Sequence, residues 1–213
     1  AFSDTISVTF NNGNISPFSP QFGIRYEYGF ENACPPALFC GMSVNNDNYP
    51  PDVQQWETSS LAPHTGNNHM AIHANSNSAI AKNDWFYSAP LHLLAGKLYR
   101  LSFWYSSSNP KASEQFQVYA GNTTNSFDML ATAPIYSKSN IANQVYVKDS
   151  ATDFIAPLSG IYYFGFYAHS AVAQANLYID DISVKEVTVT QLQTGSCGTL
   201  NSLNDVIYAN PVY

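Results

Sequence analysis

The sequence contains few charged residues. Only 11% of its 213 residues are Asp, Glu, Lys or Arg, whereas soluble domains carry about a quarter. Eight Lys and Arg against fifteen Asp and Glu give a formal net charge of −7, which argues against nucleic-acid binding because phosphate backbones require a basic surface. No apolar run approaches the roughly 20 residues of a membrane span. Coiled coils need abundant Glu, Lys, Arg and Leu, and these residues are also sparse.

Long helical patterns are missing as well, because apolar residues do not recur at the spacing of an amphipathic helix. The aromatic content is 15%, and together with the low charge it excludes intrinsic disorder. The 28 Tyr and Phe residues favour strands, whereas 21 Asn and 24 Ser favour turns. A chain of this length can bury about 70% of its unfolded surface, which is enough for one sizeable core. This composition is typical of a secreted β-protein.

Alternating patterns predict many short strands, and clusters rich in Asn, Gly and Ser predict the turns between them. We expect strands at 5–10, 23–30, 69–74, 98–105, 115–120, 144–148, 153–156, 161–168, 176–184 and 186–192. Residues 41–68 read as a long irregular connection, which in a compact domain is usually functional or stabilised by an ion. The fold class is therefore all-β, a jelly-roll sandwich of two antiparallel sheets. Residues 1–190 form one binding module, and 191–213 a C-terminal extension or linker with one more strand near 206–208.

Cysteine is scarce, with three residues in the chain. Cys34 and Cys40 bracket a short segment whose two prolines could hold the sulfurs near each other, which favours a local disulfide and an oxidising compartment. The alternative is a pair of inert buried thiols. Cys197 is left over, either free or paired outside this chain. No Cys and His set has zinc spacing. Since no signal peptide is present, we expect a mature or excised fragment of a larger secreted or surface protein.

Several segments, in their order along the chain, resemble a known family. They are Phe30-Glu31-Asn32, Pro63-His64-Thr65-Gly66, Asn83-Asp84-Trp85, Gly96-Lys97-Leu98-Tyr99, Gly160-Ile161-Tyr162-Tyr163 and Tyr178-Ile179-Asp180-Asp181. Over about 25–187 the chain resembles the cleaved-adhesin and choice-of-anchor J jelly rolls of secreted bacterial proteins. It more distantly resembles MAM domains and carbohydrate-binding modules of the galactose-binding-like fold. Family members usually have a Trp after the first Pro-Pro, whereas Ala37 stands there in this chain, so this connection departs from the pattern.

The adjacent carboxylates Asp180 and Asp181 are the strongest single feature. Neighbouring strand residues point to opposite faces, so we expect one of the two side chains to face inward or toward a neighbouring loop. A buried carboxylate is costly unless it is paired or bound to a cation, and side-chain cations are few. Calcium prefers carboxylate, amide and carbonyl oxygens, which Glu31, Asn46 and Asp47 could supply. The resemblance likewise implies a structural calcium shared by Glu31 and one of these aspartates. The alternative is an Asp that accepts hydrogen bonds from loop amides.

Aromatic residues supply the candidate ligand contacts. Trp104 and Tyr105 are adjacent on one expected strand, so one of them faces outward and could stack on a sugar ring. Trp85 is a further candidate, with a core position as its alternative. His69 and His73 have a spacing that suits zinc only on a helix, and this segment reads as a strand. We expect His64 to sit in a turn whose polar groups order the connection.

No enzyme constellation is evident in the sequence. It contains neither a Gly-x-Ser-x-Gly elbow nor a His-Glu-x-x-His motif. We therefore predict a non-catalytic module with structural calcium, located outside the cell or on its surface, which recognises a polysaccharide or surface glycoprotein without entering the membrane. One alternative is a structural spacer in a larger adhesin, and another is a polysaccharide hydrolase or lyase on the same fold.

Overall fold

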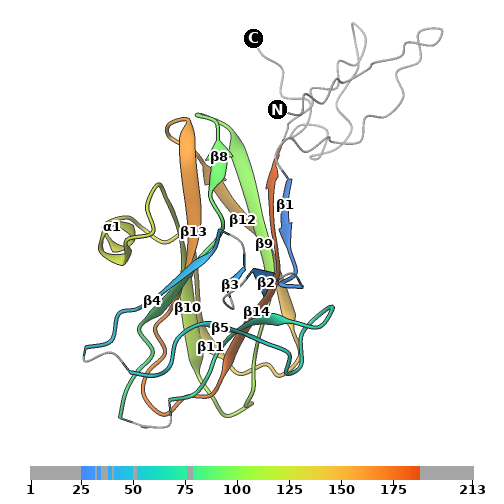
Figure 1. Ribbon diagram of the computed structural model, residues 1–213, viewed down its shortest axis with the longest axis vertical. Coiled ribbons are helices and arrows are strands. Elements are labelled where there is room, and N and C mark those ends of the chain that lie inside the picture. Colours follow the sequence, from blue (N-terminus) through green and yellow to red (C-terminus); the bar gives the residue numbers. More distant parts are fainter. Residues whose placement is uncertain are drawn as a thin grey trace, which may run out of the picture. The chain divides into compact units, whose positions relative to one another are not determined.

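The chain forms strands almost throughout the part that the structure describes. The computed structural model describes residues 25–31, 33–34, 38–39, 41–49, 52–75 and 79–187. The strands are β1 (Arg25–Tyr28), β2 (Ala33–Cys34), β3 (Leu38–Phe39), β4 (Ser43–Asn46), β5 (Glu57–Ser59), β6 (His69–Ile72), β7 (Asp84–Tyr87), β8 (Leu91–Leu93), β9 (Leu98–Ser107), β10 (Glu114–Gly121), β11 (Tyr136–Ile141), β12 (Val147–Ile155), β13 (Gly160–Ala168) and β14 (Leu177–Glu186). One helix accompanies them, α1 (Ser126–Leu130) (Figure 1). No helix in these ranges is long and apolar enough to cross a membrane.

The strands form two antiparallel sheets, which confirms the all-β sandwich prediction. In the first, called the β9 sheet, the strand order is β12-β9-β14-β6-β5, and β1 also pairs with β14. In the second, called the β10 sheet, the order is β11-β10-β13-β7-β4, and β8 also pairs with β13. Strands β2 and β3 form a small separate ribbon. Neighbours in each sheet are mostly distant in sequence, as expected for a jelly roll.

The core lies between the two sheets, where every second residue of the long strands points inward. On β9 these residues are Leu101, Phe103 and Tyr105, all buried. Phe103 meets Phe166 of the opposite sheet edge-on, with ring centroids 5.3 Å apart. Phe166 also stacks on Phe86 at 4.5 Å. Most of the abundant aromatic side chains therefore stabilise the sandwich, and few remain for a ligand.

A second buried cluster lies on the outer face of the β10 sheet, under α1. It consists of Trp85, Tyr87 and Tyr119 with Met129 of the helix. Trp85 is fully buried and stacks on Tyr167 with ring centroids 4.5 Å apart. The prediction of Trp85 as a ligand contact is therefore wrong in this structure, because the ring is enclosed in this cluster. Its alternative as a core residue is the observed one.

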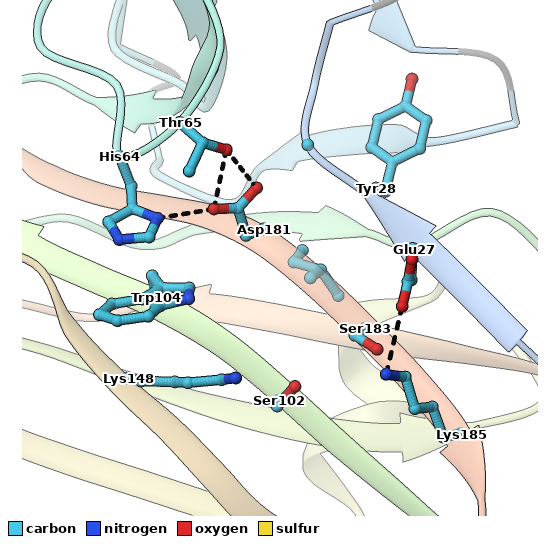
Figure 2. A pocket seen from close by; sticks show the side chains of 12 residues that line it. Glu27, Tyr28, His64, Thr65, Ser102, Trp104, Lys148, Asp181, Ser183 and Lys185 are labelled. Atoms are coloured by element: carbon cyan, nitrogen blue, oxygen red, sulfur yellow. Dashed lines mark hydrogen bonds and ion pairs between the residues drawn. The ribbon is translucent and has the colours of Figure 1, made fainter. Parts of the chain in front are cut away.

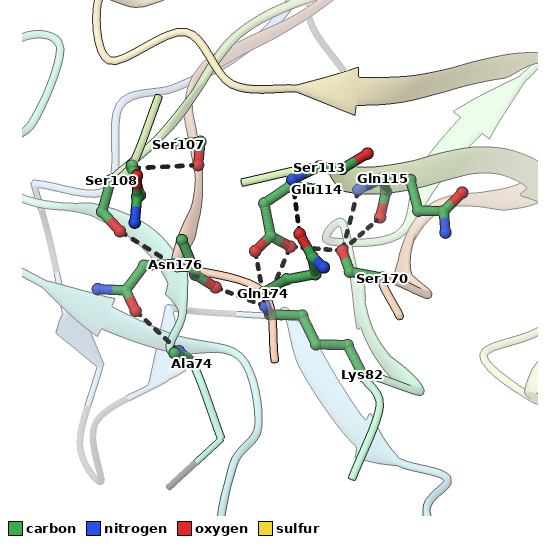
Figure 3. Close-up of polar contacts among 12 residues, drawn as sticks. Ala74, Lys82, Ser107, Ser108, Ser113, Glu114, Gln115, Ser170, Gln174 and Asn176 are labelled. Atoms are coloured by element: carbon green, nitrogen blue, oxygen red, sulfur yellow. Dashed lines mark hydrogen bonds and ion pairs between the residues drawn. The ribbon is translucent and has the colours of Figure 1, made fainter. Parts of the chain in front are cut away.

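A buried ion pair ties together three chain segments that are far apart in sequence (Figure 3). The Lys82 Nζ lies 3.0 and 3.1 Å from the two carboxylate oxygens of Glu114, and donates to the Ala175 carbonyl at 2.6 Å. The Ser170 hydroxyl also donates to Glu114. Burial lowers the pKa of Lys82, and the Glu114 carboxylate opposes this shift. Because each charge satisfies the other, removing either one would strand a buried charge.

The expected strands correspond to β1, β6, β9, β10, β13 and β14 with small changes at their ends. Residues 144–148 and 153–156 are joined in one strand, β12, which continues past an irregularity between Asp149 and Thr152. The prediction of a long irregular connection at 41–68 is partly wrong, because these residues contain β4 and β5. The expected strand at 5–10, the extension 191–213 and all but the first two residues of the expected strand at 186–192 lie outside the described residues.

The cysteine predictions also fall outside what the structure describes. Residue 40 and residue 197 are not among the described positions, and of Cys34 only the backbone is described. The disulfide between Cys34 and Cys40 and its thiol alternative therefore both stay predictions.

Candidate functional site

Both adjacent aspartates lie on the outer face of the β9 sheet, because β14 contains a β-bulge. Asp180 is opposite Trp104 on β9, whereas Ser183 is opposite Ser102, so β14 has one extra residue at this point. The core-facing residues of β14 are Leu177, Ile179, Ile182 and Val184. The inward and outward alternation thus shifts by one residue across the bulge. The expectation that the two aspartates point to opposite faces is wrong for this reason.

The bulge coincides with a break in the edge pairing of β14. Strand β6 pairs with the segment up to Ile179, and β1 pairs with the segment from Ile182 onward. Asp180 and Asp181 fall between these two partners. The backbone of Asp181 has a φ of 48°, a left-handed conformation that Asp tolerates better than most residues. The gap leaves room for the connection between β5 and β6, called the β5–β6 loop (residues 60–68), to reach β14.

Asp180 holds the middle of the β5–β6 loop through backbone amides. Its Oδ2 accepts hydrogen bonds from the amides of His64 at 2.8 Å and Thr65 at 3.3 Å. Its Oδ1 accepts one from the amide of Asp181 at 2.7 Å. Burial raises the pKa of Asp180 to about 6, while these amides favour the ionised form. Backbone amides thus replace the water that would otherwise solvate this carboxylate.

Glu31 holds the second half of the loop in the same way. Its Oε2 accepts from the Asn67 amide at 2.7 Å, and its Oε1 accepts from the Asn68 amide at 3.1 Å. The carboxylate rests directly on Gly66, whose φ is +60°, and a Cβ at that position would lie 2.2 Å from the Glu31 Oε1. Only glycine combines this backbone conformation with this close approach.

Asp181 connects the loop to the aromatic surface of the sheet (Figure 2). Its Oδ2 lies 2.6 Å from the His64 Nδ1, and the Thr65 hydroxyl donates to its carboxylate at 2.8 and 3.0 Å. The His64 ring in turn stacks on Trp104, with centroids 3.8 Å apart and planes 21° apart. This chain of contacts fixes the orientation of Trp104 on its loop side.

A pocket of about 510 Å³ opens beside this stack, on the outer face of the β9 sheet (Figure 2). Its polar and aromatic lining comes from β1, β9, β12 and β14, and includes Glu27, Ser102, Trp104, Lys148, Ser183 and Lys185. Trp104 is half-buried, and the Lys148 Nζ lies 5.8 Å from its ring centroid. Lys185 pairs with Glu27 at 3.2 Å. The pocket therefore offers the aromatic rings of Trp104 and Tyr28, several hydroxyls and charges of both signs.

A neutral aromatic patch borders the loop on its other side. His69 is fully buried, its ring meets Tyr178 at 4.8 Å, and neither ring nitrogen has a hydrogen-bond partner among the described residues. Burial lowers the pKa of His69 to about 4, so the ring is neutral near pH 7. Tyr146 extends this patch to His64, 5.3 Å away. A smaller hollow of about 260 Å³ borders the patch.

Of the predicted ligand residues, Trp104 is the one that reaches the pocket. Tyr105 is 5% exposed and packs in the core, because it occupies an inward position of β9. The prediction of Tyr105 as a ligand contact is therefore wrong. Lys148 and Glu27 carried no sequence signal, since only the pairing of β12 with β9 and of β1 with β14 brings them to Trp104. His64 lies in the β5–β6 loop, within the connection 41–68 where a turn was expected.

The predicted calcium ligands do not come together as one set of five. Glu31, Asp180 and Asp181 contact the β5–β6 loop, whereas the Asn46 amide donates to Asp52 at 2.8 Å and Asp47 pairs through its backbone with Asn83. Within the described ranges, no three acidic, His or Cys side chains form a metal-binding group. The five-residue site thus does not fit, and the hydrogen bonds to loop amides match the alternative left open by the sequence.

The close approach at Gly66 predicts a specific loss of stability. Gly66→Ala must displace the Glu31 carboxylate and its two amide bonds, which adds about 1–3 kcal/mol to the roughly 1–2 kcal/mol cost of the left-handed backbone. Gly96 has a φ of +72°, and a Cβ there would meet nothing within 4 Å, so Gly96→Ala is the matched control that carries only the backbone cost. Urea unfolding should give a clearly larger loss for Gly66→Ala. Equal losses would show that the Glu31 contact contributes nothing.

Comparison with known proteins confirms the fold. No family model matches the chain, and no curated protein sequence matches it. The K1 cleaved adhesin domain of Lys-gingipain from Porphyromonas gingivalis W83 is 16% identical with a TM-score of 0.60, over 76% of this chain and 98% of that domain. The K3 cleaved adhesin domain of the same protein is 18% identical with a TM-score of 0.59, over 75% and 97%.

The C-terminal family 22 carbohydrate-binding module of Clostridium thermocellum xylanase 10B has the same architecture. It is 15% identical with a TM-score of 0.52, over 76% of this chain and 93% of that chain. At these identities the likeness concerns the fold. The chain thus has the jelly-roll fold of cleaved adhesin domains and family 22 carbohydrate-binding modules, as the sequence resemblance indicated.

Proposed function

We propose that this chain is a non-catalytic, extracellular binding module that recognises a glycan, either on a polysaccharide or on a surface glycoprotein, in the pocket beside Trp104. One observation carries this proposal. A half-buried Trp on the outer face of the sheet borders a pocket that is also lined by several hydroxyl and charged side chains. An aromatic ring with polar neighbours is the combination that binds a sugar, which has apolar C–H faces and polar edges.

Trp104 is held in place before any ligand binds. It stands near the middle of β9, which pairs with β12 on one side and β14 on the other. The His64 ring is packed against it and is itself held by Asp181. A fixed ring loses little conformational entropy on binding, which favours affinity in a shallow site.

The pocket also supplies polar groups for the edge of a sugar. Ser102 on β9 and Ser183 on β14 are directly paired across the two strands, and both line the pocket. Hydroxyls donate and accept, which suits the equatorial hydroxyls of a pyranose. The fold that this chain shares with adhesin domains and with a xylan-binding module supports the same function.

The acidic groups near the pocket support binding over catalysis. Glycoside hydrolysis requires two carboxyl groups that flank a bond at a defined separation. Here Asp180 is buried against loop amides, and Asp181 is bonded to His64 and Thr65. Both aspartates serve the loop, which leaves neither free to act on a substrate. If the binding experiment below finds no glycan ligand, its result favours the alternative of a structural spacer.

A glycan array followed by calorimetry on the best ligand tests the proposal. Trp104→Ala should weaken binding by about 10- to 100-fold, since a central aromatic contact commonly carries this much of the affinity. Tyr49→Ala is the matched control, because Tyr49 is 99% exposed and lies outside the pocket. The control variant should bind like the unaltered protein.

Circular dichroism must show that Trp104→Ala keeps its fold, because the ring also supports His64. Absence of binding across a broad array would overturn the proposal and favour the spacer. Undiminished binding by folded Trp104→Ala would place the glycan site elsewhere.

We further propose a calcium ion at the β5–β6 loop, in a smaller form than the five-residue set. Glu31 and one of Asp180 and Asp181 would hold it together with carbonyl oxygens of the loop. Two facts support this: these carboxylates converge on one short loop, and each Glu31 oxygen accepts a single amide and keeps a free lone pair.

Chelation tests the calcium proposal. Removing calcium with EDTA should lower the melting temperature and added calcium should restore it, because an ion that binds only the folded state stabilises it. An unchanged melting curve, with no metal detected by elemental analysis, would leave the hydrogen bonds as the sole clamp.

A further inference from the structure

The most informative group that the proposed function has not used is the Lys148 ammonium. Lys148 lies on β12 directly opposite Trp104 on β9. Its side chain is exposed, and its Nζ is 5.8 Å from the centre of the Trp104 ring. Figure 2 shows the side chain extending past the indole toward Ser102. The His64 ring covers one face of Trp104, so a ligand that reaches the other side of the indole would meet this ammonium.

Lysine and arginine are scarce in this chain, and most of those near the sheets are already neutralised. Among the described residues, the ion pairs made by lysine and arginine are Lys82 with Glu114, Lys97 with Glu186, Arg100 with Asp153 and Lys185 with Glu27. Lys148 makes no ion pair with any described residue, and its contact is with the face of Trp104. An unpaired cation at the rim of an aromatic pocket is available to a ligand's negative charge.

The carboxylates of the pocket do not cancel Lys148, because each is engaged elsewhere. Glu27 pairs with Lys185 at 3.2 Å. Asp181 accepts from Thr65 and lies 2.6 Å from the His64 Nδ1. The local positive charge beside Trp104 is thus not matched by an acid of the described residues.

From this placement we infer that the Trp104 pocket selects an anionic sugar unit, with the pyranose face on the indole and the acidic group on the Lys148 ammonium. This inference rests on the proposed glycan-binding function. Charge-assisted hydrogen bonds from an ammonium to a carboxylate or sulfate are short and strong, and here Ser102 and Ser183 line the same pocket for the sugar hydroxyls.

The net charge of −7 limits which anionic ligands fit. A long polyanion would experience repulsion from the rest of the chain, whereas at physiological salt this repulsion fades within about 8 Å. Short anionic stretches, or isolated acidic residues in a glycan, therefore suit the site better than a uniformly charged polymer. Lys148 supplies the attraction at the point of contact.

The experiment compares three oligosaccharides of equal length by calorimetry: a uronate-containing one, a sulfated one and a neutral one. The unaltered protein should bind at least one anionic oligosaccharide more tightly than the neutral one. Lys148→Gln should weaken that binding by roughly 3- to 10-fold, the range of a partly exposed charge-assisted contact, and should weaken binding of the neutral oligosaccharide less. Binding to the anionic ligand should also weaken as salt rises.

Lys138→Gln is the matched control, since Lys138 is an exposed lysine on β11 of the other sheet, and it should bind like the unaltered protein. Preference for the uronate or for the sulfate identifies which acidic group the pocket takes, and either supports the inference. Equal binding of all three ligands that is lost in Trp104→Ala overturns the anionic selectivity and keeps the glycan site. Binding that Trp104→Ala does not affect overturns both.

Discussion

The burial of one carboxylate determines how the outer face of the β9 sheet is built. Asp180 has no exposed surface, so its charge must be satisfied by the protein, and the amides of His64 and Thr65 do this. These hydrogen bonds require the β5–β6 loop to pack against the sheet at Asp180. The same loop then places the His64 ring on Trp104. The pocket is thus a consequence of how a buried charge is paired.

The scarcity of charge that marks the sequence has a structural counterpart. Most ionised side chains of the described residues have a specific partner: Glu114 holds Lys82 in the interior, and Glu31 holds two loop amides. The surface relies instead on Asn, Ser and backbone groups. In such a setting an unpaired ion such as Lys148 is conspicuous, because little else on the sheet competes for a ligand's charge.

Local patterns allowed the fold to be predicted, but only part of the site. Alternation identified β9, β13 and β14 and showed that one of Trp104 and Tyr105 must face outward. It could not show which one, because that depends on how β9 packs against the second sheet. A single inserted residue on β14 reversed the expectation for Asp180 and Asp181, and a bulge of this kind leaves no mark in the pattern. Lys148 reaches Trp104 only through pairing between strands that are distant in the sequence, which no local signal reports.

The central claim is that carboxylates of β14 and of the segment after β1 hold the β5–β6 loop against the sheet. Amide hydrogen exchange of His64, Thr65, Asn67 and Asn68 tests it most directly, because these four amides donate to Asp180 and Glu31. The account predicts protection far above that of an exposed loop, and in Glu31→Gln a loss of protection at Asn67 and Asn68 that exceeds the loss at His64 and Thr65. Exchange of all four amides at the rate of an unstructured peptide would contradict it.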